Sequence, residues 1–319
     1  MPCRLLFLGL AVWFTVPAWA GDAEAADLRL RIGSGELLRY SWQINSSSES
    51  SGRELGKPFT LTSSSVFSMT LVLKGLPRKG DAIPVTIRLQ DLTYNDKRSI
   101  GPESRIELNV SKGRIKYTEN DKVVVDSEND IGLDRIADYQ RHIKSVETGE
   151  MRSTLDATGR QSEVQGESAL VETIKNQAQA IFPILAGKEV KVGESWQDEL
   201  KMPNLGDFKL AKPAVVRSKM TFAKWEVKDG RRLAQIELAS AWEKQDLKGE
   251  NTEGLLVEIT KVNGCSTGTC LFDPATGQFV EGAIDVVIQY RIDGERDGQA
   301  TGLDVSGKTA FKFTRKTDP

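Results

Sequence analysis

Apolar and polar residues alternate along most of this chain. Between residues 66 and 73, for example, Phe67 and Leu71 project to one side while Val66 and Thr70 project to the other. Period-two alternation places one row of side chains against a core and the other in water, as in a half-buried strand. Many short strands with regular turns predict a mainly β protein, an antiparallel sandwich or half-barrel. The Ser-rich stretch 45–51 breaks the alternation and is expected to be an exposed loop.

Two stretches have helical periodicity instead. Apolar residues recur at 3.6-residue spacing between Ser168, a good N-cap, and Leu185, and Pro183 and Gly187 mark the end. This pattern predicts a helix over 167–187 that packs on the sheet; plugging a concave sheet is the alternative. A weaker pattern between Gly132 and Val146 predicts a second, inserted helix.

Short motifs recur in the same order in two parts of the chain. Gly35-Glu36 and Gly193-Glu194 each open a strand-like run, and the turns 156–161 and 273–278 share an Asp followed by Ala-Thr-Gly. We therefore expect two related β-rich halves, 27–166 and 188–319, with the helix between them. Turn dipeptides recur in any β protein, so chance repetition is the alternative.

The N-terminus is typical of an export signal. Arg4 precedes an apolar run from Leu5 to Val16, and Ala18 and Ala20 supply the small residues that a signal peptidase requires. The run is shorter than the about 20 apolar residues of a membrane span. We expect a signal peptide at 1–20 cleaved after Ala20, a flexible mature N-terminus at 21–26, and a soluble periplasmic or extracellular protein without a transmembrane segment.

The charge of the chain argues against a nucleic-acid partner. The formal net charge is −2, from 43 Lys and Arg against 45 Asp and Glu. Loss of Arg4 with the signal gives 42 minus 45, or −3. Both signs are interspersed and no basic block is present, so the electrostatic footprint of nucleic-acid binding is missing.

Cys265 and Cys270 remain after signal removal, with four residues between them. A redox pair has two intervening residues and a zinc site needs four ligands, whereas the only His is the distant His142. A tight turn through Gly268 would bring the two cysteines close enough for a disulfide, and export to an oxidising compartment favours one. We therefore expect a disulfide that pins a loop.

Catalytic signatures are weak. The run 193–197 has the first Gly and the Ser of a nucleophile elbow but Gln197 in place of the second Gly, and His142 is the only His available as a base. The acidic run 126–130 lacks the spacing and the Gly of an EF-hand, so a surface loop is expected. We predict no enzyme activity, no metal and no cofactor, although paired carboxylates for glycoside hydrolysis stay open.

Aromatic residues in the strand-like runs are the candidate ligand-lining residues. They are Tyr40, Trp42, Trp196, Trp225 and Trp242. Together they could line a concave face that binds an acyl chain or a sugar. The alternative is that they fill the core of a β protein, as buried aromatic residues usually do.

Several of these motifs together resemble a family of exported, often lipid-anchored, β-rich bacterial proteins of unknown function. The resemblance rests on the start of the mature chain at Leu28 with Gly35-Glu36, on the run from Val190 to Trp196, and on the run from Phe272 to Gly277. It implies a β-rich exported protein and offers no catalytic residues. The chain departs from lipid-anchored members because no Cys follows the signal, and the Cys265/Cys270 pair looks like an addition.

Taken together, the patterns favour a non-catalytic binding or interaction protein of the cell envelope, whose partner is another envelope protein or an apolar ligand. A structural envelope protein without a small ligand and a carboxylate-dependent hydrolase are the alternatives. A large apolar cavity lined by Trp would favour the binding protein, and two carboxylates about 5 to 10 Å apart in a cleft would favour the hydrolase.

Overall fold

The computed structural model describes residues 25–54, 57–78, 80–101, 104–166, 181–205, 208–243, 246–250, 256–296 and 299–316. Long strands dominate these residues. In chain order the elements are β1 (Ala25–Asp27), β2 (Leu37–Glu54), β3 (Lys57–Gly75), β4 (Ile83–Ile100), β5 (Ser104–Ser111), β6 (Arg114–Glu119), β7 (Lys122–Asp126), α1 (Leu133–Thr148), β8 (Met151–Leu155), β9 (Gln161–Gln165), β10 (Glu189–Lys191), β11 (Ser195–Leu205), β12 (Phe208–Lys228), β13 (Arg231–Trp242), β14 (Leu247–Glu250), β15 (Leu256–Asp273), β16 (Gln278–Arg296) and β17 (Gln299–Lys316).

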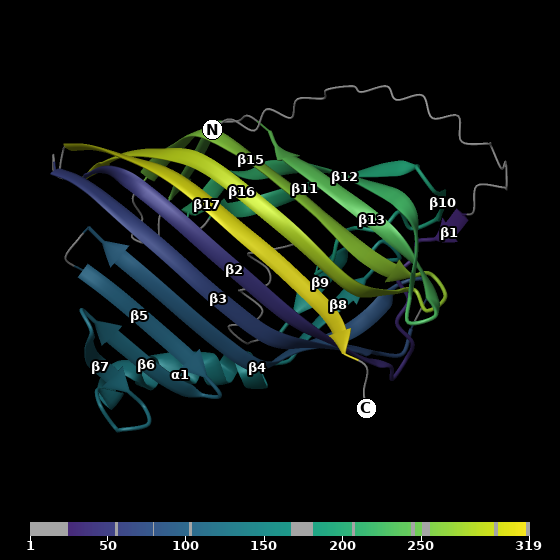
Figure 1. Cartoon of the computed structure of the whole chain (residues 1–319), viewed down its shortest axis with the longest axis horizontal. Helices are drawn as coiled ribbons and strands as arrows, with labels where there is room; N and C mark the ends of the chain where they lie inside the picture. Colours follow the sequence, from purple (N-terminus) through teal and green to yellow (C-terminus); the bar gives the residue numbers. More distant parts are fainter. Residues whose placement is uncertain are drawn as a thin grey trace.

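The strands form one large antiparallel sheet of 15 strands and a small one in which β1 pairs with β10. The main path of the large sheet is β11-β12-β13-β15-β16-β17-β2-β3-β4-β5-β6-β7. The C-terminal strand β17 pairs with β2, so strands from the two ends of the sequence meet in the middle of the sheet. The sheet is strongly bent, with β16, β17, β2 and β3 side by side in its middle (Figure 1). The mainly β antiparallel class is confirmed.

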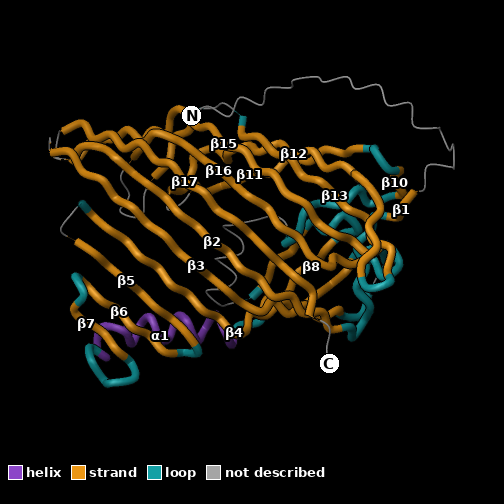
Figure 2. Tube along the Cα trace, viewed as in Figure 1, coloured by secondary structure: helices purple, strands orange, loops and turns teal. Residues whose placement is uncertain are grey.

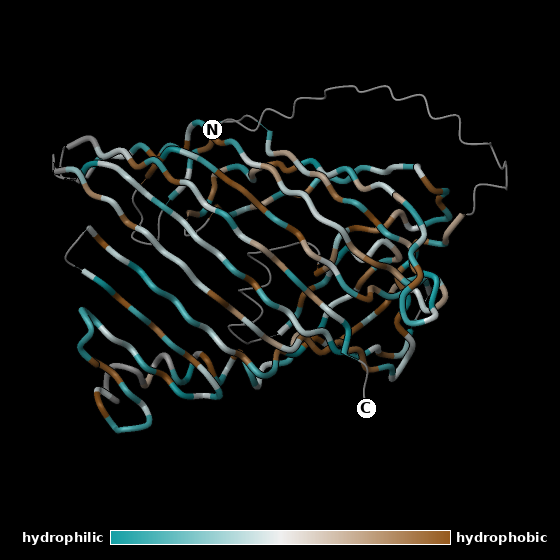
Figure 3. Tube along the Cα trace, viewed as in Figure 1, coloured by the Kyte–Doolittle hydropathy of each residue, from teal (hydrophilic) through white to brown (hydrophobic). Residues whose placement is uncertain are grey.

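Each long strand has an inner and an outer face. We call inner the face on which Tyr40, Leu71 and Phe313 project, because these side chains lie in the main core. Hydrophobic and hydrophilic residues alternate along the strands (Figure 3). On β3 the set that includes Phe67 and Leu71 is inner and the set that includes Val66 is outer, as the alternation predicts.

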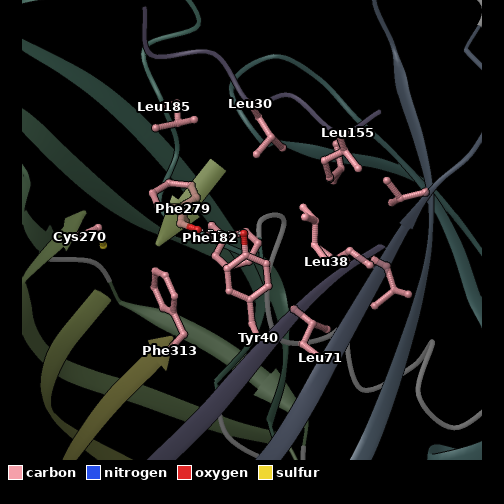
Figure 4. Close-up of a cluster of buried hydrophobic side chains, with 14 of the residues drawn as sticks. Leu30, Leu38, Tyr40, Leu71, Leu155, Phe182, Leu185, Cys270, Phe279 and Phe313 are labelled. Carbon is pink, nitrogen blue, oxygen red and sulfur yellow. Dashed lines mark hydrogen bonds between the residues drawn. The ribbon is translucent and has the colours of Figure 1, made fainter. Parts of the chain in front are cut away.

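The main hydrophobic core lies at one end of the long strands. Phe182 stacks on Phe279 at 5.1 Å and lies 4.8 Å from Tyr40 and 5.2 Å from Phe313 between ring centroids. Figure 4 shows this aromatic group with Leu30, Leu38, Leu71 and Leu155 around it. Full burial of one such side chain contributes about 1.5–3 kcal/mol. The turns and loops gather near β1 and β10, so this end of the sheet is covered by chain segments (Figure 2).

The expected insertion helix is confirmed as α1, which the periodicity placed between Gly132 and Val146. Its N-cap, Gly132, has a φ of 63°, a conformation that costs Gly little. Val146 on α1 belongs to the same core as Val110 and Val125, which places the helix on the inner face near β4 to β7. His142 lies within α1.

Only the last part of the expected connecting helix can be compared with the structure. Residues 167–180 lie outside the described residues, as does the signal peptide at 1–20. Residues 181–187 are not helical, contrary to the prediction for 167–187. Pro183 disfavours a helix at the preceding residue and has no N–H to continue it. Beyond Pro183, Leu185 instead donates from its backbone N–H to the carbonyl of Thr158.

Two further expectations differ from the structure. The Ser-rich stretch 45–51 is not a loop but the middle of β2, and Ser46 to Ser48 pair directly with Ser63 to Ser65 of β3. Within the expected flexible N-terminus, residues 21–24 lie outside the described residues, whereas Ala25 and Ala26 lie in β1, and Ala26 is buried. Pairing of β1 with β10 supplies the hydrogen bonds that hold this terminus.

The predicted Cys265–Cys270 disulfide is absent. Both residues lie on the unbroken part of β15, opposite Val287 and Gly282 of β16. Five residues of strand span about 16 Å, whereas a disulfide requires Cα atoms within about 7 Å. Gly268 does not turn the chain. Instead, an added Cβ there would lie 2.5 Å from the carbonyl oxygen of Ala283, so this Gly permits close strand packing.

The two matching turns have the same local geometry. Asp156 accepts at its carboxylate from the backbone N–H of Thr158 at 2.8 Å, and Asp273 accepts from that of Ala275 at 2.9 Å. Likewise Glu36 accepts from the N–H of Gly33, and Glu194 from that of Lys191. The sheet itself is continuous and does not divide clearly into two halves, so the duplication stays a prediction.

Candidate functional site

An apolar row crosses the inner face beside the main core. It consists of directly paired residues on neighbouring strands, so it runs across the sheet and not along any one strand. From β11 to β4 its members are Trp196, Met220, Leu238, Gly268, Ile284, Phe311, Ile44, Phe67 and Tyr94. Apart from Met220, these residues are only partly buried. We call this set the apolar row.

The outer face behind the apolar row is mostly polar. The corresponding outer residues are Gln197, Lys219, Ala239, Thr267, Asp285, Ala310, Asn45, Val66 and Asn95. Val66 is the one large apolar residue among them and is 44% exposed. Behind the apolar row, most large apolar side chains therefore lie on the inner face, although that face is not completely filled there.

The next inner row, further from the main core, is polar. From β11 to β4 its members are Asp198, Ser218, Ser240, Ser266, Val286, Thr309, Ser46, Ser65 and Asp96. Only Val286 carries no polar side-chain group. We call this set the hydroxyl row. The sequence did not predict this row, because Ser46 lies in the stretch expected to be a loop. The feature of the sequence that relates to it is the presence of two Ser-rich tracts, 46–48 and 63–65, which pair in the structure.

Hydrogen bonds within the hydroxyl row join neighbouring strands. The Oγ atoms of Ser218 and Ser240 are 2.8 Å apart, and Ser46 Oγ is 3.1 Å from Thr309 Oγ1. At one end of the row, Asp96 is buried and accepts from Arg98 Nε at 2.7 Å. At the other end, Asp198 pairs with Arg160. Both carboxylates of the row therefore have a cationic partner.

A second, smaller hydrophobic cluster lies beyond the hydroxyl row. Its buried members are Leu205, Leu210, Ala214, Leu247, Ile259 and Val262. Trp242 and Ile288, which are in the inner row that follows the hydroxyl row, pack against it. On β11 to β16 the hydroxyl row thus separates two apolar zones.

The structure places all five predicted aromatic residues on the inner face but not in one site. Tyr40 belongs to the core, is 1% exposed, and donates from its hydroxyl to the carbonyl of Phe279 at 3.1 Å. Burial is the main cause that raises the pKa of Tyr40, so the hydroxyl stays protonated. Trp242 packs with the second cluster. Its ring fills the space that Gly264 leaves open, since an added Cβ there would lie 2.5 Å from Trp242 Cδ1.

The other three Trp residues lie at the edge of the main core. Trp196 donates from Nε1 to the carbonyl of Ile184 at 2.9 Å. Trp225 packs against Phe222, with the Arg232 guanidinium 4.2 Å above its ring. Trp42 stacks on Phe313 with 5.2 Å between centroids. The Nε1 atoms of Trp42 and Trp225 are buried and have no hydrogen-bond partner within the described part of the chain.

Catalytic candidates gain no support from their surroundings. Ser195 faces outward on β11, and its Oγ lies 2.9 Å from Thr221 Oγ1. This contact is with another hydroxyl and not with a general base. Within the described ranges no group of three or more His, Cys, Asp and Glu residues is placed to hold a metal ion.

A separate cavity of about 720 Å³ lies at the far edge of the sheet. It is lined by Asn109, Ser111, Lys112, Arg114, Ile115, Lys116, Asp126, Glu128 and Asn129. Asp126 is already used to shape the loop, because its carboxylate accepts from Asn129 Nδ2 at 2.8 Å and from the N–H of Glu128 at 2.9 Å. These bonds, the Asn129 side chain first, lower the pKa of Asp126. Apart from Ile115, the residues that line the cavity are polar or charged, and none of the predicted Trp residues is among them.

Comparisons with known proteins do not identify the chain. No protein-family model matches it, and a search of curated proteins finds no match. The resemblance to an exported family therefore stays a prediction. Among solved structures, lipovitellin, described for its lipid–protein interactions, matches with 12% identity and a TM-score of 0.45 over 90% of this chain. This chain spans only 26% of the lipovitellin chain.

An outer membrane channel from Pseudomonas putida F1 matches with 10% identity and a TM-score of 0.23, over 91% of this chain and 98% of the channel. Similarities this weak identify neither the function nor a shared site. Separately, none of the helices in the described residues is both long and apolar enough to cross a membrane.

Proposed function

We propose that this protein is a non-catalytic, exported binding protein of the cell envelope that holds an apolar ligand, such as an acyl chain, against the inner face of its sheet. The observation that carries the proposal is the apolar row. It combines large side chains from eight strands, among them Ile44, Phe67 and Phe311, and all of them except Met220 are incompletely buried. Apolar surface that stays in contact with water is stabilised by a ligand that removes the water.

The polarity of the outer face supports the same choice. A partner protein that bound the middle of the outer face would meet Lys219, Asp285 and Asn45, which are charged or polar. Desolvating such groups costs free energy unless each finds a partner. An apolar ligand is therefore favoured on the inner face, with aromatic side chains supplying most of the contact area.

Titration of the full chain with lauric acid tests the proposal. We expect one or more laurate molecules to remain bound in native mass spectrometry and to displace the dye 1-anilinonaphthalene-8-sulfonate in a fluorescence titration. Far-ultraviolet circular dichroism checks that the protein stays folded. A folded protein that retains neither the dye nor laurate would contradict the proposal and favour the alternative of a structural protein.

A further inference from the structure

The polarity of the inner face changes abruptly from one row to the next. The apolar row and the hydroxyl row are neighbours, two residues apart on every strand; for example, Ile44 precedes Ser46 and Phe311 follows Thr309. Alternation along a strand only requires that a residue differ from its immediate neighbour. It does not require the same change of polarity at the same level on adjacent strands. The boundary between the apolar row and the hydroxyl row is therefore a property of the whole inner face and not of any one strand.

The polar zone is two rows deep on β2 and β3, and β17 contributes a glycine to the second row. Beyond Ser46, Ser65 and Thr309, the next directly paired inner residues are Ser48, Ser63 and Gly307. Ser46, Ser48, Ser63 and Ser65 are partly buried, as is Thr309. We call these five hydroxyl residues the head-group patch. A hydroxyl carries one donor and two acceptor positions, so the bonds described above leave capacity for a ligand.

Among the described residues, the charged groups at the border of the patch are paired with each other. Arg98 lies in the same inner row as Ser63 and is paired with Asp96, which also accepts from Ser63 Oγ at 3.4 Å. An anionic head group would have to compete with Asp96 for Arg98, and a cationic one would have to compete with Arg98 for Asp96. Neutral groups with hydroxyl and carbonyl oxygens avoid both costs.

Gly307 leaves room within the patch. A Cβ added there would meet nothing closer than 3.5 Å, at Ile288 Cγ2. Glycine weakens a strand interior and often marks close approach of a ligand or another backbone. Here it leaves room for a Cβ between the paired residues Ser48 and Ile288, on the inner side of β17.

We infer that the ligand is a neutral amphiphile of the monoacylglycerol class, with its glycerol ester on the head-group patch and its chain across the apolar row. This inference rests on the proposed function. From Ser46 to Trp42 the strand spans about 13 Å, which suits a medium-length chain that lies toward the main core. Hydroxyl and ester oxygens match the donors and acceptors of Ser46, Ser65 and Thr309.

Binding of 1-monolauroylglycerol and laurate to the full chain, by isothermal titration calorimetry at pH 8, tests the inference. The two ligands have chains of the same length, but only laurate is anionic. We expect at least tenfold tighter binding of the glyceride. The double substitution Ser46→Ala with Thr309→Val should remove most of that preference and leave laurate affinity within about twofold, because the lost hydrogen bonds involve the head group.

Two single-glycine variants provide a matched pair. Gly307→Val adds a side chain within the patch and should weaken glyceride binding at least tenfold, whereas Gly294→Val, also on the inner face but near the end of β16, should not. Equal affinity for the two ligands, tighter binding of laurate, or no effect of the patch substitutions would overturn the head-group inference while the proposed function survives. If neither ligand binds the folded protein, both fail.

Discussion

The backbone N–H of Arg31 donates a hydrogen bond of 2.8 Å to the carbonyl of Gly277. The N–H of the preceding residue, Leu30, donates a bond of the same length to the carbonyl of Ala157. Neighbouring amides of an extended segment point in opposite directions. The two turns that match in sequence therefore hold one extended segment between them, next to the main core to which Leu30 belongs.

This arrangement predicts different effects for the same substitution in the two turns. Gly159 and Gly277 have φ angles of 86° and 73°, so Ala at either position costs about 1–2 kcal/mol of backbone strain. At Gly277 the new Cβ would also lie 2.6 Å from Arg31 Cβ, whereas at Gly159 the nearest atom is Leu30 Cδ2 at 3.7 Å. We expect Gly277→Ala to lower the free energy of unfolding by at least 1 kcal/mol more than Gly159→Ala in urea titrations. Equal losses would show that the turn does not press on Arg31.

Gly282 is a second position where the packing leaves no room for a side chain. A Cβ there would lie 2.5 Å from the Phe313 ring and 2.7 Å from Cys270 Sγ. We expect Gly282→Val to destabilise the protein by about 1–3 kcal/mol, because overpacked cores must shift. Gly294→Val on the same strand is the control; its nearest contacts are at 3.5 Å, so it should be close to neutral. Thermal unfolding monitored by circular dichroism distinguishes the two variants, and a stable Gly282→Val protein would refute the packing argument.

The faces of the strands could be predicted from the sequence only where polarity alternates clearly. Alternation correctly separated the two faces of β3, where Met69 lies between Ser68 and Thr70 and differs clearly from both in polarity. It failed between Asn45 and Ser51, where both faces of β2 are polar and a period of two leaves no trace in hydropathy. Gly268 was interpreted as a turn residue, but a single Gly within a strand equally permits close approach of a neighbouring backbone.

The candidate site was less predictable than the fold. The sequence placed Trp42 and Trp196 in strand-like runs and made them candidates for a concave face. It could not group Ile44 with Phe311, or Ser46 with Thr309, because those contacts depend on β17 pairing with β2, a register between the two ends of the chain. Rows across a sheet are formed by long-range pairing, so no local pattern reveals them.

The structure predicts two reduced cysteines in distinct environments. Cys270 is buried, whereas Cys265 is partly exposed. Iodoacetamide at pH 8 should therefore modify Cys265 of the native protein first, and Cys270 only after denaturation, as judged by fragmentation of the peptide that contains both. A mass increase of this peptide upon reduction, without prior denaturation, would restore the disulfide that the sequence suggested.

Burial of the Cys270 thiol also predicts a pH dependence. Desolvation raises the pKa of Cys270 from 9.0 to about 12, because the thiolate is disfavoured in the core. Below pH 9 both states keep the proton and the group has no effect; between pH 9 and 12 only the unfolded state releases it, so stability falls as pH rises. From pH 8 to pH 10 the native sequence should lose about 1 kcal/mol more than Cys270→Ala. Equal pH profiles for the two proteins would contradict this assignment.

Adjacent residues on β3 offer the sharpest test of which face binds ligand. Phe67 is inner, in edge-on contact with Tyr94 at 6.3 Å between centroids, and Val66 is outer and exposed. Replacing Phe67 with Ser removes aromatic surface from the apolar row and should weaken laurate binding by roughly 1–2 kcal/mol, or about tenfold, whereas Val66→Ser should leave it unchanged. Both variants must first show the circular dichroism spectrum of the parent. If Val66→Ser weakens binding and Phe67→Ser does not, the ligand lies on the outer face, because the two side chains are neighbours on one backbone segment and project to opposite sides.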